Sequence, residues 1–365
     1  MNAISTNPSF WFSSFIKATP CSTIRAMNSP TLMRPWPVDG HDWAVEHLQK
    51  SMAHARVRHA YLILGPESVG KETLARAFAM ALNCTNPDPS LRPCGECSSC
   101  HRIQSGNHPD ILYSVNDPTT GALKIEEIRS VNSRIALKPF ESRYRVAIFR
   151  DFDHAQPRAQ DALLKTLEEP PRHAVLILLG SSEETILSTI TSRSQIIHLR
   201  PVAAQTVYDV LTGKYGADEE TAALLAHVSG GRIGWALHTL HNPEVLEQRE
   251  QQLNMLEEVL QSNRAGRFAL AESVSKDKQA LFPLLELWLT YWRDAVLLSE
   301  GTGLSVSNHD REHTLEQLTR YLRPEEALAA LNATQAALQT LRTNASPRLA
   351  LEVMFLDYPG LTRDS

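Results

Sequence analysis

The residues of this chain that could do chemistry centre on a phosphate-binding loop that lacks its metal ligand. The run Gly65-Pro66-Glu67-Ser68-Val69-Gly70-Lys71 matches G-x-x-x-x-G-K, in which backbone N–H groups and a Lys cradle nucleotide phosphates. The next residue of such a loop is Ser or Thr, whose hydroxyl binds Mg²⁺, whereas here it is Glu72. Gly65, Gly70 and Lys71 are therefore candidate contacts for ATP or ADP, in a loop whose metal site is degraded.

The neighbouring sequence predicts the elements that such a loop requires. Residues 59–64 are a short apolar run of strand length that ends at a Gly. Residues 71–82 are rich in Ala and Leu and contain no helix breaker. Strand, loop and helix follow in the order in which a phosphate-binding loop is built. An ordinary strand-to-helix turn that happens to contain two Gly and a Lys is the alternative.

Thr73 carries the hydroxyl nearest to the missing ligand, and we retain it among the candidate residues of the degenerate loop. Adjacent helix residues are rotated by about 100°, so we do not expect Thr73 to point where the ligand belongs. A carboxylate can bind Mg²⁺, but Glu72 would place a negative charge beside triphosphate oxygens. Both considerations predict a weakened Mg²⁺ site.

A second departure lies at the end of a predicted strand, residues 145–149. In P-loop proteins such a strand ends in an Asp that holds Mg²⁺, but here the position is occupied by Arg150. Asp151 follows, on the opposite strand face. The two departures together predict little or no ATP hydrolysis by this chain. Nucleotide binding without turnover stays open.

Four Cys predict a structural metal site. Thiolates at C-x-x-C spacing can converge tetrahedrally, and Pro93 and Gly95 favour a tight turn. In a chain without an export signal, metal is expected rather than a disulfide; zinc is the primary expectation and an iron–sulfur cluster the alternative. His101 is a substitute ligand for the first Cys, although it adjoins the last one. Cys21 has no partner. The four predicted ligands are Cys84, Cys94, Cys97 and Cys100.

The hydrophobic pattern divides the chain into an α/β part and a helical part. Near-continuous apolar strands alternating with helices predict a parallel sheet covered on both faces, with strands at 59–64, 111–115, 145–149, 174–179 and 195–199. Three short helices are expected at 204–214, 218–228 and 233–240, and longer ones from 245 to 356. We expect domains at 34–200, with the Cys module at 84–100, at 201–242 and at 243–365.

Composition limits the classes of function. The 365 residues, 42% of them hydrophobic, suggest two or three domains with proper cores. A net charge of −5 gives no overall attraction to nucleic acid. No apolar run is long enough to cross a membrane, and residues 1–33 carry no clear export signal, so we expect a cytoplasmic protein. We interpret residues 1–33 as a disordered or upstream extension, with a native start at Met27 or Met33.

The order of these parts resembles AAA+ clamp-loader subunits, specifically the bacterial DNA polymerase III gamma/tau and delta-prime family. The resemblance spans about residues 34–356. It implies a RecA-like AAA+ domain with a zinc-binding insertion, a three-helix lid and an all-α collar. It rests on Ala-Leu-Leu-Lys-Thr-Leu-Glu-Glu-Pro-Pro at 162–171, Thr-Ser-Arg-Ser at 191–194, the Cys insertion and Gly-His-Asp-Trp-Ala-Val at 40–45.

The departures favour the delta-prime type within that family. Gamma/tau subunits are the hydrolysing motors and keep an intact loop and an acidic metal strand, whereas delta-prime subunits typically carry eroded ones. Delta-prime subunits keep a Ser-Arg-Cys arginine, which corresponds to Arg193 here, with Ser194 in place of Cys. The segment 230–237 resembles the start of the lid helix, where Arg232 is only a candidate for the arginine that contacts nucleotide in motor subunits.

The resemblance implies a function exerted through a neighbouring subunit. Arg193 would act as an arginine finger on the nucleotide of an adjacent gamma/tau subunit, since a guanidinium stabilises charge on a transferring phosphoryl group. The implied partners are gamma/tau and delta subunits in a hetero-pentamer, and through it the sliding clamp and primer–template DNA. Taken without the resemblance, Arg193 caps the preceding helix or forms a surface pair, and Lys165 and Glu168 are a solvated helix end.

Three alternatives remain at this point. The first is a gamma/tau-like ATPase with residual hydrolysis, and the second a non-catalytic AAA+ scaffold. The third is an AAA+ protein outside replication. Independent catalysis by this chain is not expected, a weak ATPase being the exception.

Overall fold

The structure is a computed structural model that describes residues 36–117, 121–304, 306–341 and 345–360. The predictions for residues 1–33, including Cys21, fall outside the described residues. No described helix has the length and apolar character needed to span a membrane.

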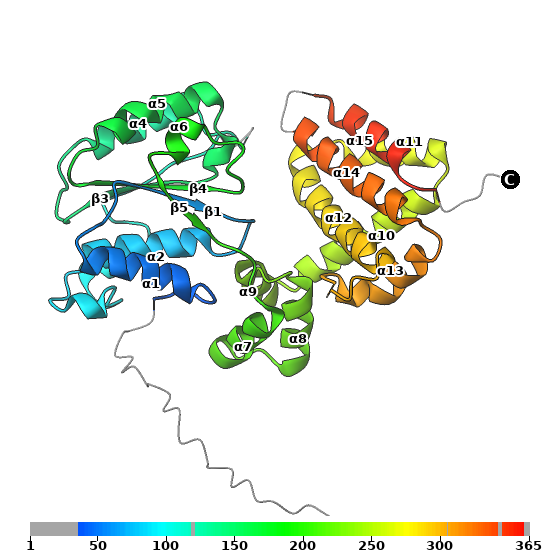
Figure 1. Ribbon diagram of the computed structural model, residues 1–365, viewed down its shortest axis with the longest axis horizontal. Coiled ribbons are helices and arrows are strands. Elements are labelled where there is room, and N and C mark those ends of the chain that lie inside the picture. The colour runs from blue at the N-terminus through cyan, green and yellow to red at the C-terminus, as the bar shows by residue number, and fades with distance from the viewer. Residues whose placement is uncertain (1–35, 118–120, 305, 342–344, 361–365) are drawn as a thin grey trace, which may run out of the picture. The chain divides into compact units, whose positions relative to one another are not determined.

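Five parallel strands form one sheet, in the order β2-β3-β4-β1-β5 (Figure 1). The predicted parallel α/β sheet is confirmed. Strand β1, which precedes the phosphate-binding loop, is hydrogen bonded to β4 on one side and β5 on the other, and Leu64 is opposite Gly180 and His198. The strands are β1 Ala60–Leu64, β2 Ile111–Tyr113, β3 Arg145–Phe149, β4 Ala174–Gly180 and β5 Gln195–His198.

Helices cover both faces of the sheet because the strands are apolar on both faces. In β1, Tyr61 and Ile63 belong to one core, while Leu62 and Leu64 belong to the other. This alternation follows from the two-residue period of a strand. Helices α1 and α2 lie against one face, and α4, α5 and α6 against the other (Figure 1).

The helices of this part include two short ones. Their bounds are α1 Asp42–Ala53, α2 Lys71–Asn83, α3 Ser98–Gln104, α4 Ile125–Ile135, α5 Pro157–Glu168 and α6 Ser188–Thr191. Single 3₁₀ turns occur at Pro89–Leu91 and Phe152–His154.

Three helices follow the sheet and share a small apolar core, which includes Val207, Leu225 and Ala236. Gly231, in the turn before the third of these helices, has φ +78°, and a Cβ there would lie 2.2 Å from the Val202 carbonyl oxygen, so only glycine fits. The helices are α7 Ala204–Tyr215, α8 Glu219–Val228 and α9 Ile233–His241.

The remaining helices enclose a core of their own around Trp288, Trp292 and Phe355. The buried Arg267 guanidinium donates to the carbonyls of Phe355 (2.6 Å), Tyr358 (2.8 Å) and Pro359 (2.7 Å) and thereby fixes the end of the last helix. The helices are α10 Glu244–Gln261, α11 Arg264–Val274, α12 Lys278–Ser299, α13 Glu312–Thr319, α14 Pro324–Leu341 and α15 Pro347–Asp357, with a 3₁₀ turn at His309–Arg311.

The expected domain boundaries fall between elements. Position 200 lies between β5 and α7, and position 242 between α9 and α10. The division into a lid and a collar stays a prediction.

Candidate functional site

The phosphate-binding loop joins the carboxyl end of β1 to the start of α2. A Cβ on Gly65 would lie 2.3 Å from the Leu199 carbonyl oxygen, so this position requires glycine. Ser68 (φ 58°) and Gly70 (φ 110°) both have left-handed backbone conformations. Strand β1 lies between β4 and β5 at the carboxyl edge, which is where open α/β sheets bind ligands. The loop therefore has the backbone form and the position of a phosphate site.

The Lys71 side chain is hydrogen bonded to backbone carbonyls of the phosphate-binding loop itself. Its Nζ donates to the carbonyl oxygens of Gly65 (2.5 Å) and Pro66 (3.0 Å). Burial lowers the pKa of this ammonium, and the charges of Asp153 and Glu67 oppose the shift. Lys71 would have to exchange these two carbonyls for phosphate oxygens in order to hold a nucleotide.

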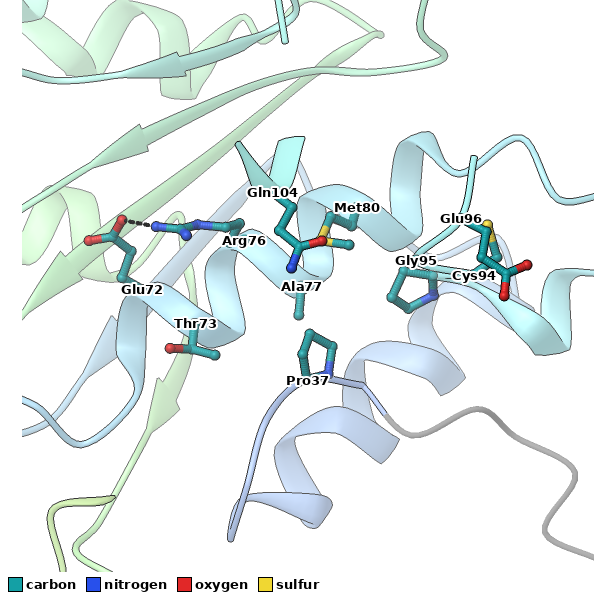
Figure 2. A pocket seen from close by; sticks show the side chains of 11 residues that line it. Pro37, Glu72, Thr73, Arg76, Ala77, Met80, Cys94, Gly95, Glu96 and Gln104 are labelled. Carbon is teal, nitrogen blue, oxygen red and sulfur yellow. Dashed lines mark hydrogen bonds and ion pairs between the residues drawn. The ribbon is translucent and has the colours of Figure 1, made fainter. Parts of the chain in front are cut away.

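Glu72 and Arg150, the two departures from the metal site, are bonded to each other. The Arg150 Nη2 donates to Glu72 Oε1 at 2.6 Å and its Nε donates to Oε2 at 3.0 Å. Arg76 adds a third bond, from Nη2 to Oε1 at 2.6 Å, which Figure 2 shows. The Arg150 guanidinium also lies 4.8 Å from the centre of the Tyr113 ring.

This network keeps Glu72 ionised. Burial alone would raise the pKa of Glu72, but the hydrogen bonds from Arg150 and Arg76 outweigh burial, so the pKa is lowered. Glu72 occupies the position of the metal-binding hydroxyl, and Arg150 that of the metal-binding Asp. The Arg150 guanidinium is thus the counter-ion of the Glu72 carboxylate. The i,i+4 spacing of Glu72 and Arg76 could have been read from the sequence. The pair with Arg150 could not, since 78 residues separate the two.

Thr73 lies on the exposed surface of α2 and lines a cavity of about 910 Å³. Figure 2 shows the Glu72 carboxylate directed at Arg76, while the Thr73 side chain projects separately from the first turn of the helix. The cavity lies between α2 and the Cys module, and its wall on the module side includes Cys94, Gly95 and Glu96. Thr73 therefore borders the same cavity as the Cys module.

Asp151, the acid next to Arg150, has a left-handed backbone conformation with φ 44°. Its Oδ2 accepts from Asn116 Nδ2 at 3.0 Å. Asp153 accepts from the backbone N–H of Ser181 at 3.0 Å. Both carboxylates thus hydrogen bond to neighbouring segments at the carboxyl edge of the sheet.

The backbone at the start of α9 also contacts the loop. Gly234 N–H donates to the Ser68 carbonyl at 2.9 Å, and a Cβ on Gly234 would lie 2.7 Å from that oxygen. Arg232, the candidate nucleotide contact in this segment, donates from Nε to the Ser229 carbonyl at 2.9 Å and lies over the Trp235 ring at 5.8 Å. Burial lowers the pKa of Arg232.

Arg193, the candidate arginine finger, lies on the surface just after α6. Its Nη1 donates to the Thr189 carbonyl at 3.0 Å and contacts Ser192 Oγ at 3.4 Å. Its Nη2 donates to Glu168 Oε1 at 3.0 Å. Within this chain Arg193 therefore makes both contacts expected without the resemblance, a helix-end cap and a surface pair, and it stays 38% exposed.

The four Cys predicted as metal ligands come together. Their sulfurs all lie within 4.8 Å of one another, and Cys84 and Cys97 sulfurs are 4.0 Å apart. A tetrahedral zinc with Zn–S of about 2.3 Å requires sulfur–sulfur distances of roughly 3.8 Å, so the set is close to the required size. Backbone N–H groups of Cys94 (3.4 Å), Cys97 (3.3 Å) and Cys100 (3.4 Å) point at neighbouring sulfurs, as expected for thiolate ligands. The donor set fits zinc.

The Cys module is tied to the sheet by polar side chains. Asn83, just before the first Cys, donates from Nδ2 to the Tyr144 carbonyl and accepts the Tyr144 N–H at Oδ1, both at 3.0 Å. Ser99 Oγ lies 3.3 Å from His108 Nε2, which is 3.2 Å from Ser142 Oγ. Nothing in the sequence marked these residues, because each pairs across 9 to 61 positions.

The fold and the loop together define a P-loop α/β protein with helical segments after the sheet. A family model described as DNA polymerase III, delta subunit, matches residues 40–203. Three curated relatives agree with it. One is the DNA polymerase III subunit gamma of Buchnera aphidicola subsp. Schizaphis graminum, 30% identical over 64% of this chain and 66% of that protein. The Bacillus subtilis subunit tau is 24% identical over 87% of this chain and 60% of that protein.

The third relative matches along nearly its whole length. It is the DNA polymerase III subunit delta' of Pseudomonas aeruginosa, 28% identical over 88% of this chain and 98% of that protein. The chain belongs to the family of DNA polymerase III clamp-loader subunits. It spans less than two thirds of the length of the gamma and tau relatives, 66% and 60% respectively.

Proposed function

We propose that this chain is a delta-prime-type subunit of the DNA polymerase III clamp loader, with an AAA+ domain, a lid and a collar. Together with gamma/tau and delta subunits it takes part in the ATP-dependent loading of a sliding clamp onto primed DNA. The observation that carries the proposal is the Glu72–Arg150 pair, because a motor subunit needs a metal at that place. A delta-prime relative is also matched over 98% of its length.

The same pair supports a degenerate ATP site. A hydroxyl and a carboxylate hold Mg²⁺ in P-loop proteins, whereas here a carboxylate and a guanidinium neutralise each other at 2.6 and 3.0 Å. Mg²⁺ would have to compete with Arg150 for Glu72 and would be repelled by the guanidinium. Lys71 and the loop backbone can still bind phosphate, so nucleotide binding, where it occurs, is independent of Mg²⁺.

Arg193 supports a role in the neighbouring subunit's reaction. Its guanidinium is at the surface, and its contacts within the chain are all exposed. A phosphoryl group in transfer is stabilised by such a guanidinium supplied from an adjacent subunit. This chain would thus complete a site that it does not itself contain.

The test is ATP turnover of the clamp-loader complex reconstituted from gamma/tau, delta and this chain, with clamp and primed DNA. We expect Arg193→Ala to reduce kcat for DNA-stimulated hydrolysis while the complex still assembles. Arg200→Ala, an exposed arginine just after β5, is the matched control and should leave kcat unchanged. Unchanged turnover with Arg193→Ala rules out the finger role.

A gamma/tau-like ATPase is the second candidate, because gamma and tau/gamma subunits are among the relatives with 30% identity. The isolated chain separates the two. Hydrolysis by the chain alone that needs Mg²⁺ and is lost in Lys71→Ala supports the motor. No hydrolysis, with nucleotide binding that is equal with and without Mg²⁺, supports the delta-prime type.

We infer that the four Cys hold one structural zinc. All four coordination positions are filled by sulfur, so a metal there stabilises the fold and has no place for substrate. The residues between Cys84 and Cys94 contain only one 3₁₀ turn. A metal that joins both ends of this segment supplies the order that an apolar core supplies elsewhere.

A further inference from the structure

Glu168 fixes the direction of the Arg193 side chain. The carboxylate Oε1 accepts from Nη2 at 3.0 Å, while Nη1 is held by the Thr189 carbonyl at 3.0 Å. The planar guanidinium is therefore held at two of its nitrogens, by α5 on one side and by α6 on the other. An arginine held in this way keeps far fewer rotamers than a free surface arginine.

The two elements that hold Arg193 are themselves fixed to each other. Glu168 is the last residue of α5, whose Leu163 and Leu167 are buried against the sheet. The buried Gln160 of the same helix donates to the Thr185 carbonyl and accepts the Leu187 N–H, both at 2.9 Å. These bonds attach α5 to the segment that leads into α6. Glu168 and Thr189 thus belong to one rigid frame around the arginine.

The pair is weak enough to leave the arginine available. The Arg193 and Glu168 side chains are 38% and 53% exposed, and an ion pair of that exposure contributes little to stability. An arginine–phosphate contact is charge-assisted and commonly bidentate, whereas Glu168 accepts from one guanidinium nitrogen only. Glu168 can therefore orient the guanidinium without keeping it from a phosphate.

We propose that Glu168 is a positioning residue for Arg193, which sets the guanidinium in the direction from which it meets the neighbouring subunit's nucleotide. This inference rests on the proposed finger role. Glu168 touches no reacting atom. It restricts the Arg193 side chain to fewer rotamers, so that a larger fraction of the molecules have the guanidinium in the orientation that meets the nucleotide. The effect belongs to the rate of hydrolysis at saturating ATP and not to the affinity for ATP.

The experiment compares Glu168→Gln with Glu169→Gln in the reconstituted complex. The two residues are adjacent and exposed, and Glu169 lies beyond the end of α5. We expect Glu168→Gln to lower kcat about threefold, by less than Arg193→Ala does, with KM for ATP unchanged. Glu169→Gln should match the unaltered complex.

A double variant shows whether Glu168 acts through Arg193. In the Arg193→Ala background, adding Glu168→Gln should have no further effect on kcat. An equal loss in both backgrounds, a changed KM or an increase in kcat contradicts the positioning role. If Arg193→Ala lowers kcat and Glu168→Gln does not, this inference fails and the finger role stands. If Arg193→Ala has no effect, the finger role fails first.

Discussion

Arg150 donates two hydrogen bonds to Glu72, at 2.6 and 3.0 Å, and so joins the end of β3 to the first turn of α2. Each residue alone would be a defect in a metal site. Together they are a neutral pair that needs no metal, and Arg76 adds a further positive group. In the sequence the two departures lie 78 residues apart, and the structure connects them.

A double-mutant cycle measures this connection. We expect Glu72→Gln and Arg150→Gln to be coupled by about 1 kcal/mol in the free energy of unfolding, because the geometry is bidentate but the side chains are 34% and 43% exposed. Urea unfolding of the two single variants and the double variant gives the coupling. Strictly additive effects would show that the contact contributes nothing to stability.

The pair also predicts a pH dependence. The folded-state pKa of Glu72 lies below its unfolded value. Its contribution is therefore present above the unfolded pKa of about 4.3 and is lost as the pH falls through the folded value. Between about pH 5 and pH 3, stability should fall less steeply in Glu72→Gln than in the unaltered chain. Glu258→Gln, an exposed residue of α10, is the control, and equal slopes for both variants would contradict the prediction.

The Cys cluster predicts one bound zinc per chain by elemental analysis. Cys94→Ser should abolish stoichiometric zinc and destabilise the chain by at least about 2 kcal/mol, because the binding free energy of a structural zinc is spent on folding. Cys21→Ser is the matched control and should keep the metal. Iron with visible absorbance in the purified protein would instead identify an iron–sulfur cluster.

Arg267 predicts a large effect on the stability of the last helices. Its guanidinium is buried and bonded to the carbonyls of Phe355, Tyr358 and Pro359. Arg267→Met leaves these carbonyls without their donor, so we expect a loss of about 2 to 4 kcal/mol in unfolding free energy. The exposed Arg264 of the same helix is the control. Urea unfolding followed by tryptophan fluorescence measures both variants, and equal stabilities would contradict this role.

Much of the fold could be predicted from apolar runs and Gly positions. Strand β3 has the predicted bounds, and the helix after the loop differs by a single residue, because both kinds of element have strong internal periodicity. Helix α3 was missed, since its seven residues lie among the Cys and carry no long apolar stripe. The pairing of Glu72 with Arg150 depends on the sheet bringing β3 beside α2, which no local pattern reports.

The candidate site shows the same division. The spacing of the four Cys predicted their convergence, because short turns leave little freedom between them. The contact between Glu168 and Arg193 spans 25 positions. The sequence around Glu168 indicated only a solvated helix end and gave no sign of this contact. Contacts set by tertiary packing had to come from the structure.

Asn83 fixes the start of the Cys module to the backbone that leads into β3. Its amide bonds both backbone groups of Tyr144, as an adjacent strand residue would, and the next residue is Cys84. The Asn83 amide thus makes the pair of hydrogen bonds that a neighbouring strand would make, at the end of α2 where the Cys module begins. An Asp at this position would keep the shape and still accept the Tyr144 N–H, but it could not donate to the Tyr144 carbonyl, so a change of one atom would remove one of the two bonds that join the Cys module to the start of β3.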